Sequence, residues 1–269
     1  MTSFGYDILG FGVGGASTVI LPTSTLINNL SNRSNVSTSS FLVNSGTLII
    51  PADFWLWASS AGTPALIVDT PNATIENSGN IVGKGGDLSG GNAISITALG
   101  VTIINNSGAF IAGAGGRGSQ GRNGSAGYGA GGGGQSGTPT LGAAGASGSG
   151  AGSGSGGGAG GGGGATTFTG TGSGGQGGYI LPGLGGAGGS SNYGSGGAGG
   201  SAGNVGGNGT RGGNDAGGPL NSNGGGGGWG AAGGGNGIDS SGSAGGKGIE
   251  SNSNSFTLTN NGTIYGSQS

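Results

Sequence analysis

The sequence contains neither cysteine nor histidine among its 269 residues. Without cysteine the chain can form no disulfide and no thiolate metal site. Without histidine it lacks the commonest general base and the commonest metal ligand. Charged residues make up only 5% of the chain, and its eight acidic residues form no pair at a spacing that suits acid–base catalysis. These absences predict that the protein is not an enzyme and needs no metal or cofactor.

Basic clusters and long apolar runs are also missing. The basic residues are scattered, whereas nucleic-acid binding needs a basic face. No run of about 18 apolar residues occurs, so we expect no membrane insertion. The opening stretch, MTSFGYDILGFGVGG, lacks the basic region of a standard secretory signal. We therefore expect a protein that is made and assembled in a cytoplasm and binds neither nucleic acid nor lipid.

Glycine is what the chain has in abundance, with 82 residues. An ordinary domain has about 7% glycine. Collagen is excluded because the glycines keep no strict three-residue register. Disorder is disfavoured because hydrophobic residues reach 30% and the net charge is only -2. An ordered, glycine-rich structure is the remaining class.

A strand–turn–strand unit occurs three times along the chain. Residues 65–83 align with 248–266 without a gap, and a third copy, AISITALGVTIINNSGAFIAG, begins at Ala93. One unit cannot bury its own apolar face, but stacked units can. The fold class is therefore predicted to be mainly β and irregular, with a parallel β-solenoid-like repeat stack that the chain leaves after Gly113 and rejoins near Gly246.

Asparagine precedes the turn in each copy, as in IENSGN and TNNGT. Two explanations are open. The side chains could form a ladder from one coil to the next, or asparagine could suit left-handed turn geometry. We favour the turn explanation.

The tract from 117 to 245 suits polyglycine II, a left-handed helix with three residues per turn and no internal hydrogen bonds. Its N–H and C=O groups point sideways, so that neighbouring helices can bond to one another. Ordering glycine is costly in backbone entropy, and the repeats would supply the template. The domains expected are an N-terminal arm and β attachment region at 1–62, two β-repeat coils at 63–116, a polyglycine II bundle with variable loops at 117–245, and a closing β-repeat at 246–269.

Bulky residues punctuate the glycine tract, and we expect them in loops at the ends of the bundle. Each of them could instead cap the bundle by packing over glycine. As a set they favour a binding surface, because rigid scaffolds that present aromatic loops are typical of recognition proteins. The candidates are Tyr128, Phe168, Tyr179, Ile180, Leu181, Tyr193, Leu220 and Trp229.

The aromatic strand DFWLWAS is apolar on both faces, with Trp55 and Trp57 on one and Phe54 and Leu56 on the other. Such a strand needs cover on both sides. We expect the tryptophan face, with Phe54, to dock on a fibre protein or on a second copy of this chain. The open alternative is that these residues belong to the core.

The motifs INNSGAFIAGAGG, IENSGNIVGKGG and NNGTIYG, joined to glycine runs with variable segments between them, resemble the receptor-recognising adhesins at the tips of T-even-type phage long tail fibres. The resemblance covers roughly residues 63–269. It implies a layered polyglycine II domain whose distal loops bind a host outer-membrane protein or surface glycan. It also implies an N-terminal part that docks on the fibre, although residues 1–62 do not match the family's attachment region.

Two functions follow from the sequence. The first is a virion tail-fibre adhesin that recognises a host receptor through the loops. The second is a structural virion component, such as a fibre, neck or baseplate piece, with no receptor role. Variation concentrated in the loops of related sequences would favour the first.

Overall fold

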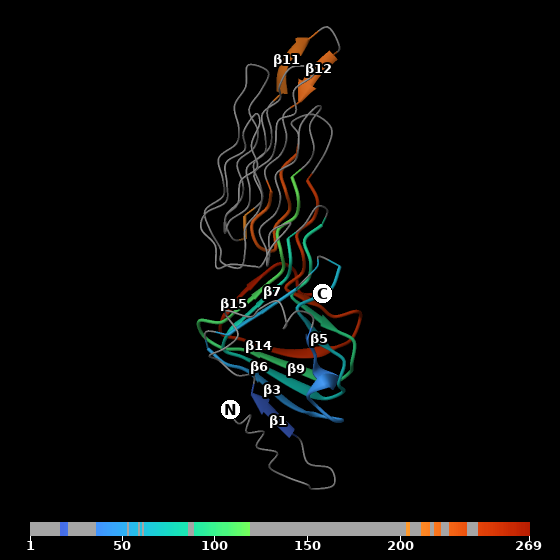
Figure 1. Cartoon of the computed structure of the whole chain (residues 1–269), viewed down its shortest axis with the longest axis vertical. Coiled ribbons are helices and arrows are strands. Elements are labelled where there is room, and N and C mark those ends of the chain that lie inside the picture. The colour runs from blue at the N-terminus through green and yellow to red at the C-terminus, as the bar shows by residue number, and fades with distance from the viewer. Residues whose placement is uncertain are drawn as a thin grey trace, which may run out of the picture.

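The fold was analysed in a computed structural model of the chain (Figure 1). The description below is confined to the part of the chain that the structure describes. These residues are 17–20, 36–52, 54–58, 60, 62–85, 89–118, 203–204, 211–215, 218–221, 226–235 and 242–269.

Three parallel sheets form a β-stack. Sheet 1 has the order β1-β3-β6-β9-β14, sheet 2 the order β13-β8-β5-β2, and sheet 3 the order β15-β10-β7-β4. Each coil passes through sheet 2, then sheet 1, then sheet 3. The expectation of a mainly β chain with parallel sheets is confirmed. The strands of sheet 1 are β1 (Ser17–Ile20), β3 (Gly46–Ile50), β6 (Ala73–Asn77), β9 (Val101–Asn105) and β14 (Phe256–Asn260).

The other two sheets have four strands each, so the stack has four full coils, and β1 extends sheet 1 beyond the first of them. Sheet 2 contains β2 (Val36–Ser37), β5 (Leu66–Val68), β8 (Ile94–Ile96) and β13 (Ile249–Glu250). Sheet 3 contains β4 (Trp55–Trp57), β7 (Asn80–Val82), β10 (Phe110–Ala112) and β15 (Thr263–Tyr265).

The first full coil was not among the repeats that the sequence predicts. It runs from β2 to β4 and pairs in register with the second coil, so that Leu48 lies opposite Ile75 and Leu56 opposite Ile81. The stack therefore begins before residue 62 and has one coil more than expected. The last coil rejoins the stack after the glycine tract, because β14 pairs with β9 and β15 with β10.

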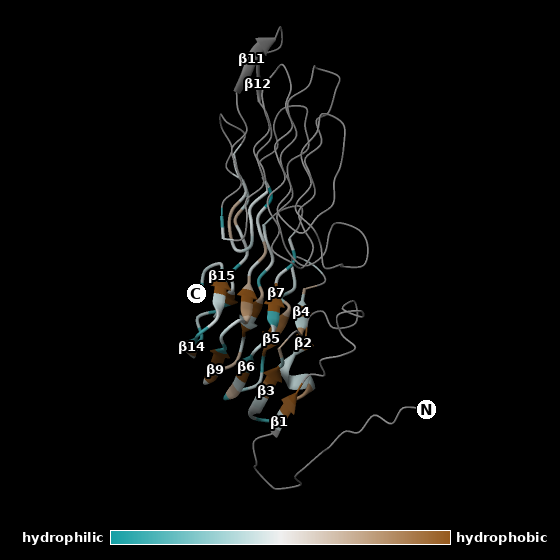
Figure 2. Ribbon diagram, turned by 90° about the vertical axis from the view of Figure 1, so that its left-hand side faces the viewer, coloured by the Kyte–Doolittle hydropathy of each residue, from teal (hydrophilic) through white to brown (hydrophobic). Residues whose placement is uncertain are grey.

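The core is made of apolar residues at alternate strand positions, which point inward from all three sheets. Ile75, Ile103 and Ile111 have no exposed surface. Burying a side chain of this size contributes about 1.5–3 kcal/mol. In Figure 2 the apolar residues, drawn in brown, gather on the strands of the stack, whereas the described glycine segments beside it are pale.

The asparagines before the turns form a ladder from coil to coil, so the turn explanation favoured from the sequence is wrong. Asn77 donates through Nδ2 to Oδ1 of Asn105 (2.9 Å), and Asn105 donates in the same way to Asn260 (2.8 Å). None of these three residues has a positive φ. Left-handed backbone occurs at other residues, such as Asn72 and Gly100 before strands of sheet 1 and Gly108 in the turn after β9. Asparagine is used here to join the coils through side-chain amides.

Extended glycine-rich segments rise from one side of the stack, next to sheet 3 (Figures 1 and 2). These glycine segments, as we call them below, belong to no sheet. Most of their backbone hydrogen bonds run to another segment or to the stack, and the turn at Gly230 adds one within a segment, from the N–H of Ala231 to the carbonyl of Gly228 (3.0 Å). The described glycine segments are residues 83–85, 89–92, 113–118, 226–235 and 242–247.

A two-stranded antiparallel hairpin, formed by β11 (Arg211–Asp215) and β12 (Gly218–Asn221), lies far from the stack. In Figure 1 it is at the end of the molecule opposite β1, beyond the described glycine segments. The chain thus has a β-stack at one end and this hairpin at the other.

Candidate functional site

The junction between the β-stack and the glycine segments is built around Trp229. Its indole packs on the outer side of sheet 3, against the rings of Trp55, Phe110 and Tyr265. The ring centroids lie 6.5, 6.2 and 5.8 Å from that of Trp229. Phe110 also stacks on Tyr265 at 6.3 Å. We call these four residues the aromatic junction.

The aromatic junction arises because the strands of sheet 3 alternate. Leu56, Ile81 and Ile111 share one register row and point into the core. Trp55 and Phe110 occupy the neighbouring row and therefore point outward. The glycine segment that carries Trp229 comes close enough to cover them.

Trp229 is fully buried, so the expectation that it lies in an exposed loop is wrong. It caps the base of the glycine segments, which was the alternative considered for each loop residue. Its Nε1 has no hydrogen-bond partner among the described residues.

The tryptophan face of β4 is likewise covered within this chain. Trp55 is 7% exposed and Trp57 is 4% exposed, while Phe54 has no exposed surface and belongs to the core. The sequence predicted that this face would lack cover in the stack. That premise is wrong, because Trp229, which is distant in the sequence, packs on Trp55.

Leu220 is the other predicted recognition residue that the structure describes. It lies in β12 of the distal hairpin, far from the aromatic junction. The structure therefore does not bring Leu220 and Trp229 together. The remaining candidates, Tyr128, Phe168, Tyr179, Ile180, Leu181 and Tyr193, lie outside the described residues.

The glycine segments approach one another so closely that several positions have no room for a side chain. The carbonyl of Gly113 accepts a hydrogen bond from the N–H of Gly230 (2.7 Å). Three residues on, the carbonyl of Gly116 accepts one from Gly227 (2.8 Å). Positions three apart therefore face the same neighbouring segment.

The positions that follow each of these, Ala114 and Arg117, bond to a different segment, again at an interval of three residues. The carbonyl of Ala114 accepts from Gly246, and that of Arg117 accepts from Ser243, both at 2.7 Å. The N–H of Ala114 donates in turn to Gly91 (2.9 Å). A strand in a sheet bonds to neighbours on two sides, whereas this segment bonds to three other glycine segments.

Close approach of the backbones explains the glycines at these contacts. A Cβ on Gly113 or Gly116 would overlap the carbonyl of Gly246 or Ser243, and one on Gly115 would overlap that of Gly227. Substitution is therefore sterically blocked where the glycine segments touch.

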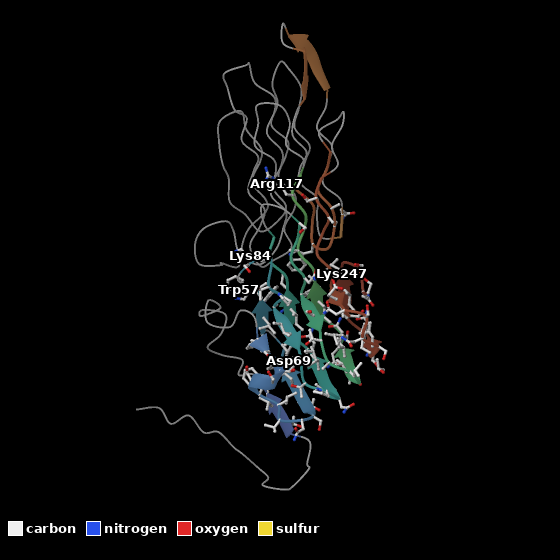
Figure 3. All side chains as sticks on the ribbon, turned by 90° about the vertical axis from the view of Figure 1, so that its right-hand side faces the viewer. Trp57, Asp69, Lys84, Arg117 and Lys247 are labelled. Atoms are coloured by element: carbon white, nitrogen blue, oxygen red, sulfur yellow. The ribbon has the colours of Figure 1, made fainter. Side chains whose placement is uncertain are left out.

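Polar contacts fix the place where the chain rejoins the stack. Lys247 forms an ion pair with Glu250 at 2.8 Å, and its N–H donates to Oδ1 of Asn92 at 2.8 Å. Figure 3 labels Lys247 at the boundary between the stack and the glycine segments. The hydrogen bond to Asn92 connects the third coil to the last one across the inserted glycine tract.

A carboxylate joins the first two coils. Asp69 follows β5 and accepts hydrogen bonds from Oγ1 of Thr38 (2.9 Å), Oγ of Ser39 (2.7 Å) and the N–H of Ser39 (2.8 Å), and from the hydroxyl of Ser37. The partners lie at the start of a 3-10 helix, Thr38–Ser40. Burial raises the pKa of Asp69, but the hydrogen bonds from Ser37, Ser39 and Thr38 outweigh it and lower the pKa to about 2.

Sequence reasoning missed this cluster, although the hydroxyl run STSS and the single Asp after the strand ALIV were visible. The part of the chain that the structure describes holds no group of three or more acidic, histidine or cysteine residues that could bind a metal ion. Within that part, no helix is both long and apolar enough to cross a membrane.

No family model matches the sequence, and no curated protein matches it. A search of solved structures finds similarity to the crystal structure of the gp37-gp38 adhesin tip complex of the bacteriophage S16 long tail fiber. The match covers 95% of this chain and 80% of that chain, at 18% identity and a TM-score of 0.38.

Proposed function

We propose that this chain is a tail-fibre-associated phage adhesin. The β-stack serves as its base, the glycine segments form a bundle of polyglycine II helices, and loops at the far end recognise a host outer-membrane protein or surface glycan. The protein acts in the virion, is assembled in the host cytoplasm, and has no enzymatic activity. Its base attaches to a fibre or other virion protein, alone or as a homo-oligomer.

The observation that carries the proposal is the three-residue period of the hydrogen bonds between glycine segments. Gly113 and Gly116 share one neighbour, and Ala114 and Arg117 share another. Polyglycine II has three residues per turn and directs its backbone groups sideways, so it accounts for both the period and the number of neighbours.

Glycine packing also decides where specificity can reside. The packed glycines cannot change, because a Cβ at Gly113, Gly115 or Gly116 would overlap the backbone of another segment. Sequence variation is free only where segments end. The hairpin formed by β11 and β12 lies at the end of the molecule opposite β1, and it includes Leu220.

The chemistry of the candidate loops favours contacts that do not depend on charge. Tyr179 and Tyr193 combine large contact areas with hydroxyl groups at a low entropic cost. Because only 5% of the chain is charged, adsorption should depend weakly on salt.

The test is a binding assay with purified, fluorescently labelled chain on a panel of Gram-negative strains. Variants carrying Tyr179→Ala with Tyr193→Ala, or Leu220→Ser alone, should keep the wild-type circular dichroism spectrum. We expect them to lose binding to the strain that the wild type recognises. Leu99→Ser, on an exposed corner of the stack, is the matched control and should bind normally.

The structural alternative gives a different outcome. A fibre, neck or baseplate piece with no receptor role would bind no strain in the panel and would not compete with phage for adsorption. Normal competition by the loop variants would equally contradict recognition through these residues.

A further inference from the structure

The last coil of the stack ends in an open edge. Its β14 and β15 are the terminal strands of sheets 1 and 3, with no further strand beside them among the described residues. Only sheet 2 is covered there. Its last strand is bridged by the C-terminal tail, in which the N–H of Ser269 donates to the carbonyl of Ile249 (3.0 Å). An uncovered edge presents backbone N–H and C=O groups that can pair with another chain.

The inward-facing residues of this coil are also incompletely covered. Phe256, Leu258 and Ile264 are only partly buried, whereas Ile103 and Ile111 of the preceding coil have no exposed surface. In stacked-repeat proteins each unit buries its apolar face against its neighbours, and a terminal unit is normally polar on its outer side. This end of the stack therefore resembles an interior coil without its neighbour.

The asparagine ladder has a direction that distinguishes its two ends. At the first end, Oδ1 of Asn77 accepts the N–H of Gly79 at 3.1 Å, so the acceptor is already used. At the last end, Oδ1 of Asn260 accepts from Asn105, but its Nδ2 donates to none of the described residues. Among the described residues, the ladder is therefore closed at Asn77 and has an unused donor at Asn260.

We propose that the open edge of β14 binds a strand of a different polypeptide chain. The strand runs parallel to β14 and places a side-chain amide oxygen in register with Asn260. In strand addition, main-chain hydrogen bonds supply affinity and side chains at alternate positions supply specificity. Here the amide of Asn260 selects the register, and Leu258 supplies the apolar contact.

Pairing between two copies of this chain does not satisfy the same geometry. In a two-fold dimer, the β14 strands of the two copies would pair with their cores on the same side of the sheet. The two strands would then run antiparallel, and Asn260 of one copy would lie opposite the start of β14 in the other. A head-to-tail copy presents β1, the outermost strand of sheet 1 at the first end, and Ser17–Ile20 contains no asparagine. Neither arrangement extends the ladder.

The probe for this edge is a labelled peptide with the sequence of residues 101–112, VTIINNSGAFIA. Within the chain this segment contains β9, which pairs with β14 in parallel and sets Asn105 opposite Asn260. On the open side of β14 the same register would present its asparagine oxygen to Nδ2 of Asn260. Binding to the full chain is followed by fluorescence anisotropy, and the site by hydrogen exchange of the Phe256–Asn260 amides.

Two variants separate the ladder donor from a general effect of charge. Asn260→Asp keeps the oxygen that accepts from Asn105 and removes only the outward donor, so the stack should remain folded. Asn261→Asp adds the same charge one residue away, at an exposed position outside the ladder. Asn260→Asp should weaken peptide binding about three- to ten-fold relative to Asn261→Asp, the effect of one hydrogen bond.

We also expect the peptide to slow exchange at β14 and not at β1. Absence of binding, equal affinities of the two variants, or protection elsewhere would overturn the proposal. Sedimentation tests the remaining outcome. If the chain self-associates with rising concentration and Leu258→Lys abolishes this, the edge binds a second copy and the proposal is overturned.

Discussion

The β-stack and the glycine segments reach order by opposite means. In the stack, side chains fill the interior, and Ile75 or Ile103 is buried because a neighbouring coil packs on it. In the glycine segments, backbone approaches backbone, and Gly115 is required because a side chain would occupy the place of another segment's carbonyl. The stack depends on side chains of the right volume, whereas the glycine segments depend on positions such as Gly115 that have no side chain.

This difference has consequences for tolerance to mutation. A hydrophobic core accepts exchanges that conserve volume, usually at a cost below about 1.5 kcal/mol. Packed glycine offers no comparable exchange, since every other residue adds at least a Cβ. The glycine segments should therefore be constant where they touch, and the sequence can diverge only at their ends.

The largest effect is expected from a substitution at a packed glycine. Gly115→Val should destabilise the chain by more than about 4 kcal/mol, since both the Cβ and its branches would displace the backbone of Gly227. The matched control is Gly62→Val, where a Cβ meets no atom within 4 Å. Urea denaturation compares the two, and similar midpoints for both variants would refute close packing at Gly115.

The next effect concerns the contact between the two regions. Trp229→Ala should lower the free energy of unfolding by about 3–5 kcal/mol, because it leaves a cavity between Trp55, Phe110 and Tyr265. Trp229→Phe keeps a ring and loses only an indole N–H that has no partner among the described residues, so its cost should be clearly smaller. Thermal unfolding ranks the variants, and equal losses would show that ring contact is not what joins the regions.

A smaller effect is expected at the centre of the asparagine ladder. Asn105→Leu keeps the number and branching of the side-chain heavy atoms but removes the amide that links Asn77 to Asn260, which should lower the free energy of unfolding by about 1–3 kcal/mol. Asn261→Leu, an exposed neighbour outside the ladder, should change the free energy of unfolding by less than about 0.5 kcal/mol. If urea denaturation gives both variants the same stability, the ladder contributes nothing to joining the coils.

The smallest effect is the acid sensitivity of the first two coils. The pKa of Asp69 is lowered from 3.8 to about 2, so its contribution is present above pH 3.8 and is lost as the pH falls towards 2. The carboxylate is partly exposed, and the difference should be on the order of 1 kcal/mol. Stability measured between pH 5 and 2 should fall less steeply in Asp69→Asn than in the wild type. Parallel curves would contradict this role for Asp69.

Sequence patterns identified the coils whose residues repeat. The gapless alignment of 65–83 with 248–266 corresponds to the register of the sheets, in which Ile75, Ile103 and Leu258 share one row. The first coil was missed because its ladder position is Ile50 and its third strand is aromatic. The alternation of apolar and polar residues in SGTLII was visible. The first coil, however, shares composition with the other coils and not their sequence.

Contacts between distant segments could not be predicted from the sequence. Trp229 is surrounded by glycine in the chain, and nothing local distinguishes a buried anchor from an exposed loop residue. Its position follows from packing on Trp55 and Phe110, which are far away in sequence. The Asp69 cluster depends in the same way on two coils being adjacent. Sequence periodicity predicts which elements form, whereas side-chain partners between elements require the packed structure.

The account depends most on the glycine segments being packed structure, and hydrogen exchange tests this directly. Gly113, Gly116, Gly227, Gly230, Gly233 and Gly246 donate backbone hydrogen bonds to other segments or to the stack. Their amides should exchange nearly as slowly as those of β9, because they open only when the segments separate. Exchange as rapid as that of the exposed turn at Val43 and Asn44 would contradict the account.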